Sequence, residues 1–216
     1  LELSNVAYEQ VILSPRSHAG YYPGATVMTL KVIFEKETYK ILGAQAVGYE
    51  GVEKRIDVIA TAIFAGLTAD KLKDLELSYA PPYSSAKDPV NMAGFIIENI
   101  KNGIVGQFYY EDIPLLQKRD DVTLLDTRTV YEYMRGHAEG FINIPVDELR
   151  ERLTELDKSK PVYVMCQSGL RSYLATRILM QNGFDAYNFA GGYRLYGTMY
   201  YDEKKKKNAY DCGMEK

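Results

Sequence analysis

The chain has 216 residues, of which 46% are hydrophobic and 25% charged, and its formal net charge is -3. This composition excludes a chain that is disordered throughout, and the acidic balance argues against nucleic-acid binding, which needs a basic face. No run of about 18 apolar residues could form a membrane helix, and the first residues lack the features of a secretory signal peptide. Two cysteines, Cys166 and Cys212, are too few for a disulfide framework. We therefore expect a cytoplasmic protein with no membrane or nucleic-acid partner.

Residues 1–103 predict an α+β domain with an antiparallel sheet. The β-branched residues in 26–34 predict a strand, and residues 39–48 predict a second strand that returns after a polar turn at 35–38. A helix follows, and its apolar stripe is expected to comprise Val52, Ile56, Ile59, Ala60, Ile63 and Phe64.

Three further signals lie before residue 104. Gly66 is expected to stop the first helix, and Thr68 to cap a short second one. The pair Asp88-Pro89 predicts the start of another helix that extends to Ile100, because proline is favoured in the first helical turn. The two glycines in residues 102–106 then indicate a linker.

Residues 107–203 alternate strands with helices, which predicts a parallel sheet flanked by helices. Strands are expected at 122–126, 161–165 and 186–190, and helices at 146–156 and 171–182. The second helix is expected to bury an apolar stripe of Leu174, Ile178 and Leu179, and to end at Gly183. Residues 204–216, which begin with four lysines, predict a solvated basic tail.

Several cofactor motifs are missing from the sequence. There is no Gly-x-Gly-x-x-Gly, no Walker sequence and no Cys-x-x-Cys, and the two histidines, His18 and His137, are far apart. We therefore expect no metal and no nucleotide cofactor in this chain.

The strongest chemical signal is a cysteine at the end of a predicted buried strand. Cys166 is followed by Gln167, Ser168, Gly169 and Leu170, and a helix is expected to begin near Arg171-Ser172. Successive loop amides, the positive end of the helix dipole and the Arg171 guanidinium all favour a thiolate over a thiol. Cys166 is thus the predicted nucleophile, Arg171 its cationic partner, and the other residues of 167–172 its binding loop. The alternative is that Cys166 is a small buried hydrophobe.

The length of this loop discriminates between two reactions. Four residues separate Cys166 from Arg171, one fewer than in cysteine phosphatases. A tighter ring suits a single sulfur atom, carried as a persulfide, better than a phosphate or arsenate tetrahedron.

With these motifs, residues 107–200 resemble the rhodanese family. The matching pieces lie at 124–128, 136–145, 166–172 and 190–193. The resemblance implies a sulfurtransferase in which Cys166 takes sulfane sulfur from a donor, such as thiosulfate or a persulfide, and passes it to a thiol. Two positions depart from the family: Gln167 stands where many members have Arg, and Tyr193 stands where Trp is frequent.

Three further residues of this segment are expected to support the loop. Asp126 and Arg128 could act as acid and base, but we favour a charged pair that orders the neighbouring loop. His137 could be a general base, but the family pattern favours a structural hydrogen bond in a turn. Cys212 could resolve a persulfide, but a spectator thiol is favoured.

Residues 1–100 resemble the C-terminal dimerisation domain of flavin disulfide reductases. The matching pieces lie at 42–48, 54–57 and 79–89, and the similar branch is coenzyme A-disulfide reductase, including NADH-dependent persulfide reductases with a fused rhodanese domain. The resemblance implies a homodimer formed through residues 1–103. It also implies that Tyr79 reaches the partner subunit's active site with a second tyrosine, which is either Tyr21 or Tyr22.

The flavin domains of such enzymes are absent from the sequence, so FAD, NAD(P)H and coenzyme A are expected only in an intact parent. Three hypotheses follow. The chain is a sulfurtransferase domain on a reductase dimerisation module, a cysteine phosphatase or arsenate reductase of the same fold, or a non-catalytic dimerisation fragment.

Overall fold

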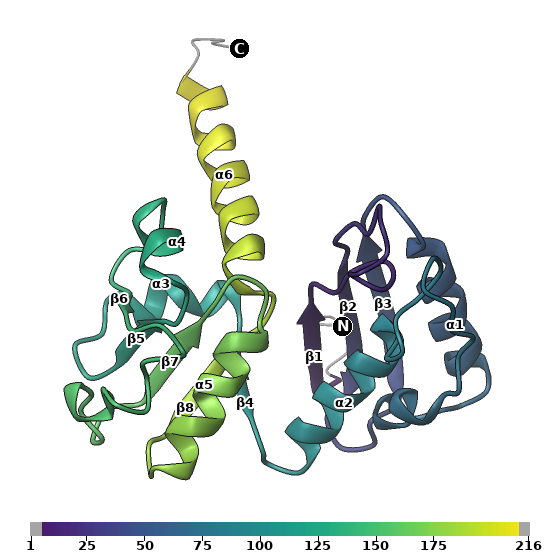
Figure 1. Ribbon diagram of the computed structural model, residues 1–216, viewed down its shortest axis with the longest axis horizontal. Helices are drawn as coiled ribbons and strands as arrows, with labels where there is room; N and C mark the ends of the chain where they lie inside the picture. The colour runs from purple at the N-terminus through teal and green to yellow at the C-terminus, as the bar shows by residue number, and fades with distance from the viewer. Residues whose placement is uncertain (1–5, 212–216) are drawn as a thin grey trace. The chain divides into compact units, whose positions relative to one another are not determined.

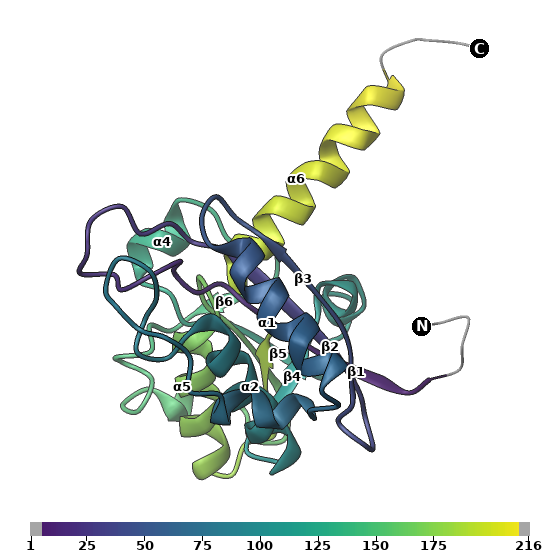
Figure 2. The ribbon, with the colours of Figure 1, turned by 90° about the vertical axis from the view of Figure 1, so that its right-hand side faces the viewer.

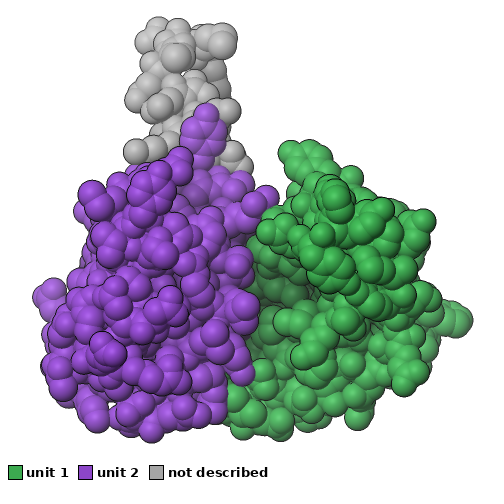
Figure 3. Space-filling model, in the orientation of Figure 1, with its two compact units in different colours: residues 1–106 green, residues 107–216 purple. Residues whose placement is uncertain are grey.

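The computed structural model describes residues 6–211, and side chains for residues 6–201. The chain divides into two compact units, Leu1–Gly106 and Gln107–Lys216 (Figure 3). Within residues 6–211, no helix is both long and apolar enough to cross a membrane.

The sheet of unit 1 has three antiparallel strands in the order β1-β2-β3, which are Tyr8–Leu13, Thr29–Glu35 and Ile41–Val47 (Figure 1). The β2–β3 pair confirms the predicted hairpin, with a register shift between Ile33 and Phe34. The sequence pattern did not predict β1. This edge strand begins with three polar or amphipathic residues and buries only Val11 and Leu13, so the alternation of apolar and polar residues that marks a strand is short.

The helices of unit 1 pack on one face of this sheet (Figures 1 and 2). They are α1 at Val52–Phe64, the 3₁₀ helix η2 at Ala69–Asp74, and α2 at Pro89–Lys101. The predicted stripe of α1 is wrong in part, because the buried positions are Arg55, Ile59 and Ala62, whereas Phe64 is 94% exposed. A buried ion pair of Arg55 with Asp88 sets this rotation of the helix.

Unit 2 contains a five-stranded sheet in the order β4-β8-β7-β5-β6. The strands are Gly106–Phe108, Thr123–Asp126, Ile142–Asn143, Val162–Met165 and Ala186–Phe189 for β4 to β8. Strand β5 pairs in parallel with β6 and β7, and β7 pairs in parallel with β8. The structure thus confirms the predicted fold class: an antiparallel α+β domain followed by a parallel sheet with helices.

The helices of unit 2 are α3 to α6, at Ile113–Leu116, Val130–Met134, Leu170–Gln181 and Gly192–Asp211, with 3₁₀ turns η3 at Tyr110–Asp112 and η4 at Leu153–Glu155. The predicted helix at 146–156 is wrong. Its amides bond three residues back, as in Leu149 to Val146 and Arg152 to Leu149, so the segment forms 3₁₀-type turns. Helix α5 matches the prediction for 171–182, but Leu174 is 47% exposed.

Helix α6 was not predicted as a helix. It includes residues 204–211 of the predicted basic tail, and Cys212 lies outside the described residues.

The sheet of unit 2 is covered on both faces, because alternate residues of β7 contribute to different cores. Val162 and Val164 pack in a cluster with α5 residues such as Leu179. Tyr163 and Met165 pack in a second cluster with Phe189. Buried on both sides, β7 is a rigid base for the residue that follows it, Cys166.

Candidate functional site

Cys166 lies directly after the carboxyl end of β7, and only 1% of its surface is exposed. The Gly169 amide donates a hydrogen bond to Sγ over 3.1 Å. The fully buried Ser172 places its hydroxyl 3.2 Å from Sγ and 3.1 Å from the Gly169 carbonyl oxygen. The sulfur is therefore buried in a polar cradle rather than among apolar side chains alone.

Two helices fix the loop around Cys166. Gly169 has φ +106°, which favours glycine, and it is the N-cap of α5, whose first amides have no acceptor within the helix. From the other side, the amide of Tyr193 donates to the Cys166 carbonyl over 2.7 Å, and that of Arg194 to the Gln167 carbonyl over 3.1 Å. The loop's carbonyls thus bind the start of α6, and the positive end of α5 lies beside the sulfur.

Gly192 explains the Gly-Gly sequence that precedes α6. A Cβ atom at this position would lie 2.6 Å from the carbonyl oxygen of Gln167, and φ is +69°. Only glycine allows α6 to approach the cysteine loop this closely.

Arg171 does not direct its charge at the sulfur alone. Its Nη1 and Nη2 donate to the two carboxylate oxygens of Glu132 over 2.6 and 2.7 Å. These bonds outweigh the partial burial of both groups, so they raise the pKa of Arg171 and lower the pKa of Glu132 to about 2. Arg171 is therefore largely neutralised by a carboxylate from α4, which differs from the lone cation that the sequence predicts.

Sequence reasoning missed Glu132 as a partner of the loop. Its carboxylate also accepts from the amide and hydroxyl of Thr129, so it completes the capping box of α4. The Thr-x-x-Glu spacing is visible in the sequence and signals the cap, but the pairing with Arg171 spans 39 positions.

Asp126 and Arg128 form a fully buried ion pair, with Nη2 and Oδ2 2.7 Å apart. Arg128 also donates to the carbonyl oxygen of Gly136 over 2.8 Å, and its Nη1 lies 3.5 Å from Oε1 of Gln167. The guanidinium carbon stacks 3.8 Å from the ring centre of Tyr193. The pair thus joins β5, the cysteine loop and α6, and the hydrogen bonds of Asp126 are directed at Arg128.

His137 is exposed, and its hydrogen bond and ring contact are with Tyr133 rather than with residues 166–172. Its ring stacks on Tyr133 at 3.9 Å, and Nδ1 lies 3.1 Å from the Tyr133 carbonyl oxygen. This arrangement fits a structural hydrogen bond in the turn after α4.

A pocket of about 310 Å³ opens beside the loop, and the residues that line it are Arg128, Glu132, Arg135, Gly136, Gln167 and Tyr193. Gln167 is the loop residue that faces this pocket, and it is next to Cys166. Ser168 and Leu170 are exposed, and Leu170 is 63% accessible.

The predicted tyrosine site lies in unit 1. The hydroxyl oxygens of Tyr79 and Tyr21 lie 2.5 Å apart, and both side chains are exposed. This hydrogen bond raises the pKa of Tyr79. Tyr22 instead packs edge-on against His18 at 5.7 Å. Tyr21, not Tyr22, is therefore the tyrosine that the structure brings together with Tyr79.

A buried ion pair supports the two loops that carry these tyrosines. Arg55 Nη2 lies 2.8 Å from Asp88 Oδ2, and it donates to the Ser17 carbonyl over 2.8 Å. Ser84 donates to Asp88 over 2.7 Å, and Asp88 also caps α2. The ion pair thus ties the segment before Tyr21 to the segment after Tyr79.

A metal ion and a dinucleotide each need a particular set of residues around them. Among the described residues, no group of three or more His, Cys, Asp or Glu side chains could hold a metal ion. The turns that join strands to helices, at 48–51, 127–129 and 166–169, lack the glycine spacing that lets backbone approach a pyrophosphate. These turns therefore do not offer the backbone cradle that FAD or NAD(P)H needs.

Two family models match the chain. The dimerisation domain of pyridine nucleotide-disulphide oxidoreductases matches residues 2–89, and the rhodanese-like domain matches residues 111–198. A coenzyme A disulfide reductase of Staphylococcus epidermidis is 46% identical over 94 residues, which are 44% of this chain and 22% of that protein.

Two solved structures resemble almost the whole chain. The reduced Bacillus anthracis protein CoADR-RHD is 50% identical with a TM-score of 0.89, over 92% of this chain and 35% of its own. The NAD-dependent persulfide reductase from A. fulgidus is 41% identical with a TM-score of 0.79, over 88% of this chain and 34% of its own. The chain therefore spans about a third of these proteins.

Proposed function

Since the chain joins the dimerisation domain of pyridine nucleotide-disulphide oxidoreductases to a rhodanese-like domain, and is homologous to coenzyme A disulfide and persulfide reductases, we propose that residues 107–203 form a sulfurtransferase domain. Its carrier is a persulfide on Cys166. The observation that supports this proposal most strongly is the polar cradle of the sulfur, formed by the Gly169 amide and the Ser172 hydroxyl at the start of α5.

The proposed reaction needs no external oxidant. The Cys166 thiolate attacks the sulfane sulfur of a donor R–S–S⁻, a new Cys–S bond forms, and the donor's S–S bond breaks to release R–S⁻. An acceptor thiolate then attacks the outer sulfur of Cys–S–S⁻ and regenerates the Cys166 thiolate. The Gly169 amide, 3.1 Å from Sγ, is placed to stabilise negative charge on the sulfur during both steps.

The structure favours this reaction over phosphate or arsenate chemistry. The short loop leaves less room for a tetrahedral anion. Hydrolysis of an aryl phosphate that depends on Cys166 would support the phosphatase instead.

Unit 1 supplies the second part of the proposal. Residues 1–103 form a homodimer, and Tyr79 with Tyr21 extends toward a site of the partner subunit, as in the family that this unit resembles. The exposed hydroxyl pair and its buried Arg55–Asp88 support agree with that role. In a longer reductase, sulfur carried by Cys166 would be delivered to a flavin-proximal cysteine that these 216 residues do not contain.

Steady-state sulfur transfer tests the proposal. The chain is mixed with thiosulfate, polysulfide or coenzyme A persulfide and a thiol acceptor, and the released product is measured. We expect turnover with at least one donor, and its loss in C166S. No turnover above background for either wild type or C166S would leave a non-catalytic dimerisation fragment, whose homodimer is measured independently by sedimentation.

A further inference from the structure

The pocket beside Gln167 is lined by three charged side chains, and two of them are already paired with an opposite charge. Arg128 is bound by Asp126 at 2.7 Å, and Glu132 is bound by Arg171 at 2.6 Å. These two pairs cancel in charge. Arg135 is the third, and among residues 6–201 no carboxylate lies within ion-pair distance of its guanidinium.

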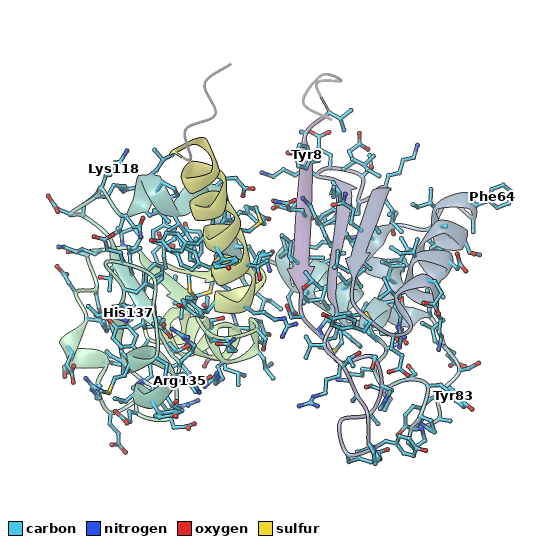
Figure 4. The ribbon with its side chains drawn as sticks, turned by 90° about the horizontal axis from the view of Figure 1, so that it is seen from above. Tyr8, Phe64, Tyr83, Lys118, Arg135 and His137 are labelled. Carbon is cyan, nitrogen blue, oxygen red and sulfur yellow. The ribbon has the colours of Figure 1, made fainter. Side chains whose placement is uncertain are left out.

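The position of Arg135 is fixed by its neighbours. It ends α4 and is exposed, and its guanidinium lies 5.6 Å from the ring centre of Tyr131. The next residue, Gly136, is held by Arg128 through its carbonyl oxygen and has φ +150°, with Tyr193 3.0 Å from where a Cβ would be. Arg135 therefore projects from an anchored turn at the rim of the pocket, near His137 (Figure 4).

We propose that Arg135 binds the anionic end of the sulfur donor, and that the preferred donors are small persulfides whose carrier bears a negative group away from the sulfur. This inference rests on the proposed function and specifies its donor class. The unpaired cation gives the pocket a net positive charge, which attracts one anionic group. The carrier end would lie against Arg135, while the sulfane sulfur passes Gln167 to reach Cys166. The reaction is the exchange already described, with the carrier thiolate as leaving group.

A matched pair of donors tests the assignment. Mercaptopropionate persulfide carries a distal carboxylate, whereas N-acetylcysteamine persulfide of similar length carries none. We expect R135Q to raise KM for the carboxylate donor about five-fold more than KM for the neutral donor, which is the effect of losing one solvent-exposed charge contact. R150Q is the control, because Arg150 is exposed in the same unit and outside the pocket.

The outcomes separate this inference from the proposed function. If wild type transfers sulfur from both donors but R135Q changes both KM values equally, or changes them no more than R150Q does, Arg135 is not the anion-binding residue. If wild type transfers sulfur from no donor, the sulfurtransferase proposal itself is overturned. An R135E variant that prefers the neutral donor would support the assignment further.

Discussion

Replacing Glu132 with Gln removes one charge from the pair that ties α4 to the cysteine loop. Gln retains a carbonyl oxygen that can accept from Thr129, so the cap of α4 is largely kept. The change therefore isolates the ionic contact with Arg171.

The size of the effect follows from the pKa of Glu132, which the Arg171 hydrogen bonds lower from 4.5 to about 2. Complete transfer of that shift into stability would give roughly 3 kcal/mol, at ~1.4 kcal/mol per pKa unit. Because the two side chains are 31% and 32% exposed, solvent screening reduces the expected contribution to about 1–2 kcal/mol.

The effect has a defined pH dependence. The pKa of this carboxyl is lower in the folded state, so its contribution is fully present above the unfolded value of 4.5 and is lost as pH falls toward about 2. Wild type should therefore be more stable than E132Q at pH 7, and the difference should shrink between about pH 5 and pH 2.

The assay is urea unfolding in which hydrogen exchange of the peptide that contains β7, Val162–Met165, reports on unit 2. E155Q serves as the control, because the exposed Glu155–Arg152 pair lies in the same unit away from the loop. A free-energy difference for E132Q that is absent at pH 7, or that is unchanged at low pH, would refute the reasoning.

Three further predictions concern the supports of the two sites. G192A should lower sulfur transfer at least ten-fold, because the new Cβ would lie 2.6 Å from the Gln167 carbonyl oxygen and would displace the cysteine loop. Dimerisation through unit 1 should change little, and unchanged turnover would contradict this prediction. D88N should destabilise unit 1 by about 3–5 kcal/mol, because it leaves Arg55 buried without its counter-charge, and a melting temperature equal to wild type would count against it. Y21F should lower the pKa of Tyr79, since it removes the hydrogen bond that raises it, and site-resolved NMR titration showing no shift would exclude that cause.

The sequence predicted those parts of the fold that local patterns determine. The apolar runs of β5, β7 and β8 and the turn from Cys166 into α5 are each encoded within a few residues. Strand β1 was missed because only Val11 and Leu13 of its 6 residues are buried, which is too short an alternation to predict a strand. The segment 146–156 has leucines at helical spacing, but it forms 3₁₀-type turns that bury Leu149 and Leu156.

The site shows the same division between local and long-range information. The position of Cys166 at the end of a strand, and its contacts with Gly169 and Ser172, could be predicted from adjacent residues. The partner of Arg171 does not, because Glu132 is on another helix and each residue alone is an ordinary surface charge. The buried face of α1 was also set by a distant residue, Asp88, which draws Arg55 into the core.

In the proposed function, Cys166 carries sulfur covalently. The most direct test is mass spectrometry of the Cys166 peptide after treatment of the intact chain with a sulfane-sulfur donor and removal of excess reagent. We predict that this peptide gains the mass of one sulfur atom, that a thiol acceptor removes it, and that the peptide with Cys212 does not gain it first. A Cys166 peptide of unchanged mass with thiosulfate, polysulfide and coenzyme A persulfide would contradict the account.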